Sequence, residues 1–566
     1  MFIFEREMGG RQYRIAAESV WDAATQTPVS RQVVLGPAGV APTVKLSNTK
    51  VVGTRRVGDV GALGWVAEQL KVVQLIDEAC VSSLGAGPSV GELALAVAVQ
   101  RACVPGAKNQ LAEFLGSSVA RLSCLPAESF TGQAFYRAAA GLTDEQLEHA
   151  QILIARAAVE RFGLSADVLA FDSTNFDTHI ATTTKGDLAR RGHAKSKRSD
   201  LRVVGLGVLV SETGHVPLLH RVYPGNGSDQ ALMASCMAGL GLLHDELDAA
   251  QGRKAGQKQR TMVRDGGFWS EQLDLELTQA GYGTLISLPL SHSASRVALT
   301  YAAERGHMKA LTGALKGVRA ARLDTKVGDL KRTLVVVESE ELLLGQKRGI
   351  AVALRKAKAE LKMLVRRSEA GRIKRPALEA RVQKALAREH LSVFVTTAIH
   401  GSDDAPTLTW SVDAARRREL ERTRLGRRVL CTDRAAWRTE RIVSAFRGQW
   451  NVEELFRRAK GGGLVPWGPS FQRADASLRL HTFATVLGLT LTALAKLALG
   501  SKQSARAVMK DLAEIEATLV RTSNGRKGRP PTAMLAPALS KTQLRAVNTF
   551  DLARWMPSLL STIQQG

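Results

Sequence analysis

The stretch that decides the fold is "DVLAFDSTNF" (167–176), in which a short apolar run leads into acid and hydroxyl residues. An apolar run of this length predicts a buried β-strand. The segments that follow alternate between strand and helix patterns, and the turn signal "ETG" separates the first two of them. They are "LRVVGLGVLVS" (201–211), "HVPLLHRVYPG" (215–225), a helical run (230–250), "RTMVRDGGFWS" (260–270) and "YGTLISLPL" (282–290). This order predicts an α/β protein built on a mixed sheet.

Outward from this stretch, the residue pattern changes several times along the chain. Short alternating runs near the N-terminus predict strands, and apolar residues at i, i+3 and i+4 between about 60 and 160 predict helices. Ser89 followed by Glu92 is a capping box at the head of one of these helices. The expected segments are a β-rich module (1–50), a helical region (51–160), the first part of the α/β core (161–290), an α+β insertion (291–435), the second part of the core (436–500) and a helical tail (501–566) with a linker, "SNGRKGRPP" (523–531).

The charge of the chain is its most unusual bulk property. Lys+Arg number 78 and Asp+Glu 53 among 566 residues, which gives a formal net charge of +25. Such an excess favours a polyanionic partner, of which nucleic acid is the commonest. The alternative is a basic surface kept for solubility.

The cysteines and the apolar runs favour a soluble intracellular protein. Five widely spaced cysteines without a CxxC pair argue against a disulfide framework or a zinc site. The N-terminus carries charges where a signal peptide needs an apolar run. The best membrane candidate, "TFATVLGLTLTALAKLALG" (482–500), contains threonines and Lys496, so we expect a buried core helix there.

Three carboxylates form the candidate catalytic set. Asp172 and Asp265 each follow a short apolar strand, in "VLAFD" and "TMVRD", and Glu453 lies in a helical run. Two strand-end aspartates and a glutamate suit Mg²⁺, and two such ions can activate water or a DNA 3′-hydroxyl for attack on a phosphodiester. Taken singly, a strand-end aspartate is as often a turn or N-cap residue, and Ser173 or Thr174 can also cap.

The run "FRGQWNVEELFRRAK" (446–460) places its two glutamates differently. On a helix, Val452, Leu455, Phe456 and Ala459 form a buried stripe. Glu453 then lies roughly 110° from the centre of the stripe, on the side of Lys460 and Gln449, and Glu454 lies roughly 150° away, in solvent. We therefore expect Glu453 at the rim of a cleft and Glu454 as a surface charge.

The ordered stretches "FDST" (171–174), "VRDGGF" (263–268) and "FRGQWNVEELFRRAK" (446–460) resemble the DDE transposases of bacterial insertion sequences. More narrowly, they resemble the insertion-sequence-four superfamily and its sixteen-thirty-four group, whose third acid lies in the pattern Tyr-x2-Arg-x3-Glu-x6-Lys. Glu453 and Lys460 match this pattern, and Phe446 and Gln449 stand where it has Tyr and Arg. The resemblance extends over most of residues 1–500.

The resemblance implies an RNase H-like core with an insertion before Glu453, and a transposase that cuts and rejoins DNA at its own element's ends. Asp172, Asp265 and Glu453 would be catalytic and would hold two Mg²⁺, with Mn²⁺ as a substitute. The N-terminal and helical regions would recognise the terminal inverted repeats. The partners would be double-stranded DNA, at the element ends and the target, and a second copy in a synaptic homodimer. A bacterial cytoplasmic protein, associated with the nucleoid when bound to DNA and with no membrane partner, is expected.

Cations near these acids are the expected phosphate contacts. Phe446 lacks a phenolic hydroxyl, and Gln449 cannot make a charge-assisted fork to a phosphate, so neighbouring arginines are candidates to substitute. The expected DNA-binding residues are Lys460, Gln449, Arg447, Arg457, Lys195, Lys197, Arg198 and Arg202. Trp269 and Trp450 lie near the acids in sequence, and core packing is expected for Trp450. Two alternatives stay open: an RNase H-type nuclease without strand transfer, and a non-catalytic DNA-binding protein derived from a transposase.

Overall fold

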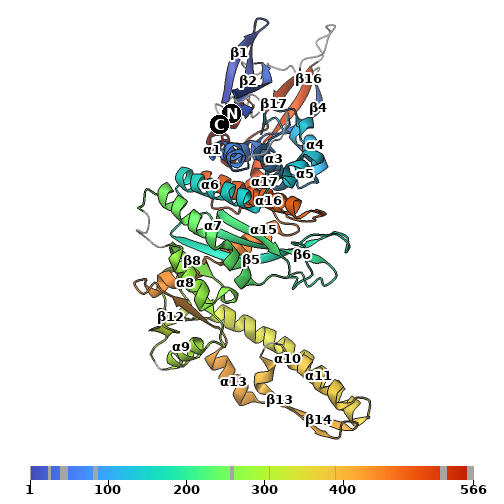
Figure 1. The fold of residues 1–566 in the computed structure, drawn as a ribbon, viewed down its shortest axis with the longest axis vertical. Coiled ribbons are helices and arrows are strands. Elements are labelled where there is room, and N and C mark those ends of the chain that lie inside the picture. Colours follow the sequence, from blue (N-terminus) through green and yellow to red (C-terminus); the bar gives the residue numbers. More distant parts are fainter. Residues whose placement is uncertain are drawn as a thin grey trace. The chain divides into compact units, whose positions relative to one another are not determined.

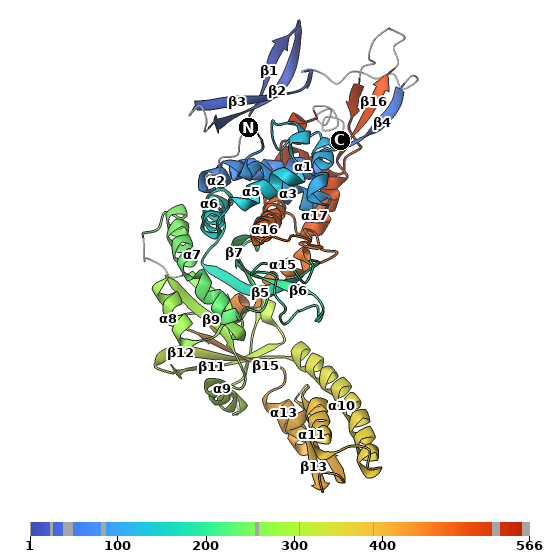
Figure 2. The ribbon, with the colours of Figure 1, turned by 45° about the vertical axis from the view of Figure 1, so that its right-hand side comes forward.

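The computed structural model describes residues 2–22, 27–37, 49–80, 87–254, 260–304, 306–388, 390–522 and 532–556. The predicted linker at 523–531 lies outside these ranges. The chain divides into two compact units (Figures 1 and 2). The first unit is Met1–Met262, Leu275–Tyr282 and Gly448–Gly566, and the second is Val263–Asp274 and Gly283–Arg447.

Two small sheets belong to the first unit. Strands β1 (Phe2–Met8), β2 (Arg11–Asp22) and β3 (Thr27–Pro37) form an antiparallel sheet, where alternating runs predicted strands. In the second sheet, β16 (Glu516–Thr522) pairs with both β4 (Thr49–Arg56) and β17 (Thr532–Leu535). The prediction of a purely helical tail is therefore wrong. The run "EATLVRT" alternates in the manner of a strand and buries Ala517 and Val520.

The predicted helical region of the first unit is helical, and its helices are α1 (Gly58–Gln69), α2 (Val72–Ala79), α3 (Val90–Cys103), α4 (Leu111–Gly116), α5 (Gly132–Ala140) and α6 (Asp144–Phe162). The predicted capping box is confirmed, because Glu92 N donates to Ser89 Oγ at 3.1 Å and Ser89 N donates to Glu92 Oε2 at 2.9 Å. Helices α17 (Ala505–Ala513) and α18 (Lys541–Thr549) pack beside α1.

Helix α16 (Asp475–Ala498) is long and apolar enough to span a membrane, and 89% of its apolar window is buried inside the protein. It packs against α3, α5 and α6. The prediction of a buried core helix is confirmed. The bent pair Val90–Cys103 and Lys108–Gly116 passes the same test of length and composition.

The predicted strands and hairpin of the α/β core are present in the first unit. Strands β5 (Val168–Thr178), β6 (Arg202–Ser211) and β7 (Pro217–Pro224) pair antiparallel in chain order. Helix α7 (Asp229–Ala250) follows β7 and packs against α6 and β7. Its N-cap is Ser228, whose side chain accepts a hydrogen bond from Ala231 N. Helix α15 (Trp450–Ala459) packs against β5 and β6 (Figure 1).

The protein is a mixed α/β protein with one large sheet, of strand order β10-β11-β12-β15-β9-β8-β5-β6-β7. The remaining strands are β8 (Arg260–Arg264), β9 (Tyr282–Leu288), β10 (Lys309–Ala310), β11 (Val318–Val327), β12 (Leu330–Ser339) and β15 (Arg427–Thr432). The expectation that residues 291–435 contribute nothing to the sheet is wrong, since four of these strands come from that segment. Strand β15 provides the reason: its apolar run pairs with β12 on one side and β9 on the other.

The second unit also contains an arm of helices and two short strands. Helix α10 (Glu340–Glu369) continues into α11 (Arg375–Leu386) and α12 (Leu391–Phe394), and β13 (Val395–Gly401) pairs with β14 (Pro406–Val412). Helix α13 (Ala414–Thr423) follows. The arm has its own apolar core, which includes Leu354, Leu361, Leu378 and Phe394. The other helices of this unit are α9 (Ser293–Ala303) and α14 (Thr439–Arg447), with α8 (Glu271–Gln279) at its boundary.

Candidate active site

Asp172 lies inside strand β5 rather than at its end. The predicted strand stopped at Asp172, but β5 continues to Thr178 because β6 pairs with it along that whole length, from Leu169↔Ser211 to Thr178↔Arg202. Asp172 is half-buried, and its Oδ1 accepts a hydrogen bond from Ser173 N at 2.7 Å. The paired strand fixes the backbone of Asp172 on both sides, which gives the carboxylate a rigid base.

Ser173 connects β5 to helix α7 on the opposite face of the strand. Its Oγ donates to Asp229 Oδ1 at 2.8 Å. Burial raises the pKa of the nearby Tyr223 hydroxyl, and the negative charges of Asp229 and Asp172 raise it further, against the hydrogen bond with Ser173. The Tyr223 phenol therefore stays protonated close to these carboxylates.

The basic stretch between β5 and β6 is tied to β5 at three points. Lys195 Nζ donates to Ser173 O at 2.5 Å, Lys195 N donates to Asn175 Oδ1 at 3.0 Å, and Ser196 Oγ donates to Asp177 Oδ1 at 2.8 Å. The expected phosphate-binding Lys195 is thus held one residue from Asp172.

The other three cations of this stretch lie differently. Lys197 is exposed and has a positive φ of 64°. Arg198 is exposed and pairs with Asp200, with Nε and Oδ1 2.6 Å apart. Arg202 donates to the carbonyl oxygens of Thr182 and Thr184. Of the four, Lys195 contacts β5 through its side-chain amine, and Arg202 contacts it through its backbone, whose carbonyl oxygen accepts a hydrogen bond from Thr178 Oγ1 at 3.0 Å.

The predicted helix 446–460 is broken near its start. Helix α14 ends at Arg447 in the second unit and α15 begins at Trp450 in the first. Within α15 the predicted stripe is confirmed, because Val452, Leu455, Phe456 and Ala459 are all buried. This stripe packs α15 against β5, so Glu453 and Asp172 belong to elements in direct contact.

Glu454 was predicted to be the more exposed of the two glutamates of α15, but Glu453 is the more exposed one. Glu453 is exposed and has no hydrogen bond or ion pair with the described residues. Glu454 is only 30% exposed at its side chain and pairs with Arg457 at 2.7 Å and Arg458 at 3.5 Å. The prediction that Glu454 lies free in solvent is wrong, since two arginines one turn further along the helix cover it.

Lys460 lies just beyond the end of α15. It is the C-cap residue, and its N–H still donates to Phe456 O at 3.0 Å. Its ψ of 166° redirects the residues that follow, so the backbone of Lys460 keeps the position of the next helical residue, on the predicted side of Glu453. Burial lowers the pKa of the Lys460 amine, and the charge of Lys195 lowers it further, while Asp177 and Asp172 act in the opposite direction. Lys460 is therefore within electrostatic reach of both Lys195 and Asp172.

Of the residues around the N-terminus of α15, Trp450 departs from its predicted position. Gln449 is the N-cap residue and is 8% exposed, without a side-chain capping hydrogen bond. Trp450 is 58% exposed, and the guanidinium of Arg457 lies 5.3 Å from its ring centroid. The prediction of core packing for Trp450 is wrong, because it falls outside the buried stripe of α15.

Asp265 belongs to the second unit, where it directly follows β8 as predicted. It is exposed and stands at the head of a 3-10 turn, Gly266–Phe268, without a side-chain capping hydrogen bond. Gly266 is required there because a Cβ would lie 2.6 Å from Ser287 O. Phe446 is buried in α14 of the same unit, with the Arg428 guanidinium 6.0 Å from its ring, and Arg447 is exposed.

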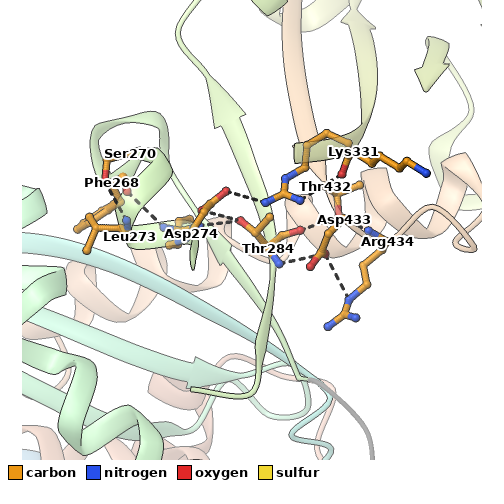
Figure 3. Close-up of polar contacts among 11 residues, drawn as sticks. Phe268, Ser270, Leu273, Asp274, Thr284, Lys331, Thr432, Asp433 and Arg434 are labelled. Carbon is orange, nitrogen blue, oxygen red and sulfur yellow. Dashed lines mark hydrogen bonds and ion pairs between the residues drawn. The ribbon is translucent and has the colours of Figure 1, made fainter. Parts of the chain in front are cut away.

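A buried ion network beside this turn was not predicted (Figure 3). Arg264, fully buried, pairs with the buried Asp274, donates to Thr284 Oγ1 at 2.6 Å and reaches Phe268 O at 3.3 Å. Thr284 N in turn donates to Asp433 Oδ1 at 3.1 Å. Burial raises the pKa of Asp433, against the nearby Arg434 and the hydrogen bond from Thr284. A charged residue inside an apolar strand, Arg264 in "RTMVR", was the signal available in the sequence.

The donor set of the first unit is compatible with a magnesium ion. Asp172 and Glu453 supply hard carboxylate oxygens from two packed elements, and Mg²⁺ in phosphoryl-transfer sites is commonly held by one or two carboxylates together with substrate phosphates. No group of three or more His, Cys, Asp or Glu side chains is arranged to hold a metal ion within the residues that the structure covers. The two carboxylates therefore fit an ion that shares its coordination with a bound phosphate.

Among solved structures, comparison finds chains that resemble this one. No protein-family model and no curated protein sequence matches this chain. A cryo-EM structure of a piggyBac transposase synaptic complex with hairpin DNA matches with a TM-score of 0.34 and 11% sequence identity, over 80% of this chain and 78% of that chain.

Proposed function

We propose that this protein is a DDE-type DNA transposase, which cleaves DNA at the ends of its own element and joins those ends to target DNA. The observation that carries the proposal is the packing of α15, with the exposed Glu453, on the strand that holds Asp172. The resemblance of "FDST", "VRDGGF" and "FRGQWNVEELFRRAK" to this family supports it and assigns the third carboxylate to Asp265. The net charge of +25 supports a nucleic acid substrate.

The side chains around Asp172 have complementary tasks in this proposal. Asp172 and Glu453, with Asp265, would hold Mg²⁺, which when bound neutralises phosphate charge and lowers the pKa of a coordinated water or 3′-hydroxyl. Lys195 and Lys460 supply the positive charge that draws a phosphodiester toward carboxylates that would otherwise repel it. The β6 pairing of β5 holds Asp172 in place while the phosphodiester is cleaved.

The N-terminal module and the helical region are assigned to recognition of the element ends. This part of the proposal rests on the resemblance, which extends through both. The expected partner in the synaptic complex is a second copy of the chain, and the expected compartment is the bacterial cytoplasm.

A cleavage assay on DNA that carries the ends of the encoding element tests the proposal. The intact protein should nick or cut at the ends only with Mg²⁺ or Mn²⁺, and joined products should appear on a supercoiled target plasmid. Asp172→Asn should lower both activities by about a hundredfold to a thousandfold, while end binding is kept because no cation is lost. Cleavage without joining would favour the nuclease alternative.

The non-catalytic alternative is favoured by a separate observation. Phe446 and Gln449 replace the Tyr and Arg of the family pattern, Phe446 is buried in α14, and the described residues contain no ready-made three-ligand metal group. Specific binding of the ends without metal-dependent cleavage, in a folded protein, would establish this alternative and overturn the catalytic proposal.

A further inference from the structure

The arm of the second unit presents a groove between helices α10 and α11, which lie side by side in both ribbon views (Figures 1 and 2). The inner sides of these helices pack on a common apolar core through Leu354, Leu361, Leu378 and Val382. The outer sides leave a groove of about 950 Å³. Its lining is Arg348, Gly349, Val352, Ala353, Lys356, Ala357, Glu360, Met363, Arg381, Lys384, Ala385 and Arg388.

The rims of this groove are basic and its floor is small or apolar. Five of the lining residues are cations and one, Glu360, is an acid. Val352 and Met363 in the floor are 44% and 37% exposed. The surrounding stretch is also rich in positive charge, with fourteen Lys and Arg and five Glu over residues 340–388.

The five cations of the groove have no acidic partner among the residues that the structure describes. All five are exposed, and none forms an ion pair with any residue in the described ranges. This contrasts with their neighbours Lys347 and Arg417, which both pair with Glu421 of α13. Unpaired cations gathered in a concave surface attract anions more strongly than cations scattered on a convex one, since the surrounding low-dielectric walls concentrate the field.

We propose that this groove binds the sugar–phosphate backbone of duplex DNA, as a contact separate from the carboxylate site. The inference goes beyond the proposed function and rests on it only in the choice of DNA as the polyanion. The five cations would pair with phosphates, and the exposed Val352 and Met363 would contact sugars between them.

The dimensions of the groove favour a continuous polyanion over a single small anion. Arg348 and Lys356 are eight residues apart on α10, so their backbones are separated by about 12 Å along the helix. One DNA strand carries a phosphate every 3.4 Å of its axis, so this length corresponds to about three or four phosphates. The groove volume is about thirty times the liquid-state share of one water, which leaves room for a hydrated backbone. A single phosphate would leave most of the five cations without a partner.

The test compares two variants of the full-length protein that lose the same charge. The groove variant replaces Arg348, Lys356, Arg381, Lys384 and Arg388 with Gln. The control variant replaces Arg355, Lys358, Lys362, Arg366 and Arg372, which are likewise three Arg and two Lys, all exposed and outside the groove. The four control positions on α10 lie roughly 90° to 170° around the helix from the centre of the groove side. Affinity for a random-sequence duplex without element ends is measured in EDTA at several salt concentrations.

The groove variant should lose about 4.5 units from the log–log salt slope, because each of the five lost phosphate contacts removes about 0.9. The control variant should lose less than one unit. An unchanged slope in the groove variant, or equal losses in both variants, would overturn the proposal; in the first case an acidic protein segment becomes the better occupant. The assay contains no metal and no element ends. Its result can therefore be interpreted even if the transposase proposal fails.

Discussion

The two aspartates of the candidate triad are held by different means in the two units. In the first unit, Asp172 lies mid-strand, half-buried, and its position is fixed by the backbone pairing of β5 with β6. In the second unit, Asp265 is exposed in a turn. That turn is anchored by the buried Arg264 guanidinium, which bridges Phe268 O, Asp274 and Thr284.

Near Asp172, charged side chains are accessible to solvent. Near Asp265, buried charged side chains stabilise the fold. Around Asp172, the cations Lys195 and Lys460 remain at least partly accessible and are available to a phosphate. Near Asp265, Arg264 and Asp274 form a buried ion pair with each other. Substitutions near the first aspartate should therefore change activity, and substitutions near the second should change stability.

The largest expected effect tests the role of Glu453 in the first unit. Glu453→Gln should lower the cleavage rate by about a hundredfold to a thousandfold, because it removes a proposed metal-binding carboxylate. Glu454→Gln is the matched control: it breaks a partly exposed pair with Arg457 and Arg458, worth at most about 1 kcal/mol, and should change the rate by less than about fivefold. Rates are measured in single turnover on element-end DNA. Equal losses in the two variants would show that α15 presents its acids differently.

The second prediction tests whether the buried ion network around Arg264 stabilises the second unit. Arg264→Met removes the ion pair between Arg264 and the buried Asp274, which keeps its contacts with Thr284 Oγ1 at 3.3 Å and with Arg332 at 3.5 Å. It should lower the free energy of unfolding by about 3–5 kcal/mol, since a buried charge loses its partner. Denaturant unfolding measures the loss. The control Arg198→Met removes an exposed, solvent-screened pair with Asp200 and should leave the denaturation midpoint nearly unchanged. A similar small cost in both variants would contradict a structural role for the network.

The smallest expected effect concerns pH and the first unit. Burial, and secondarily the charge of Arg221, lowers the pKa of His220 to about 3. Between pH 6.5 and 3 the unfolded chain binds a proton that the folded chain does not, so stability is present above pH 6.5 and falls as the pH drops. At pH 5 the loss from this one group is about 2 kcal/mol.

Hydrogen exchange of segment 217–224 at pH 5 and pH 7.5 measures this loss, after correction for the intrinsic pH dependence of exchange. His220→Gln should reduce the difference in protection between the two pH values. A difference that stays the same in the variant would assign the acid sensitivity to other groups, of which the buried His481 is the first candidate, because its pKa is also well below its ordinary value.

The candidate site was predictable in part, and the errors have specific causes. The apolar stripe of α15 and the position of Asp265 after β8 follow from local periodicity, and the structure agrees with both. The end of β5 was placed too early because "STNFDT" carries polar residues, whereas pairing with β6 decides where the strand stops. The partners of Glu454 were missed because they depend on side-chain directions of Arg457 and Arg458, which an ideal helical wheel does not give.

The amino-acid sequence alone determined the net charge, the capping box at Ser89, the core helix at Asp475–Ala498 and the strand runs of β5 to β9. These follow from composition and from neighbours within about one turn or one strand, where propensity and periodicity act. Only the tertiary structure decided that β16 pairs with β4, that β15 joins β12 to β9, and that Arg264 meets Asp274 and Thr284. Such contacts join residues far apart in the chain, and their free energy depends on burial and hydrogen-bond partners that exist only after the segments have packed.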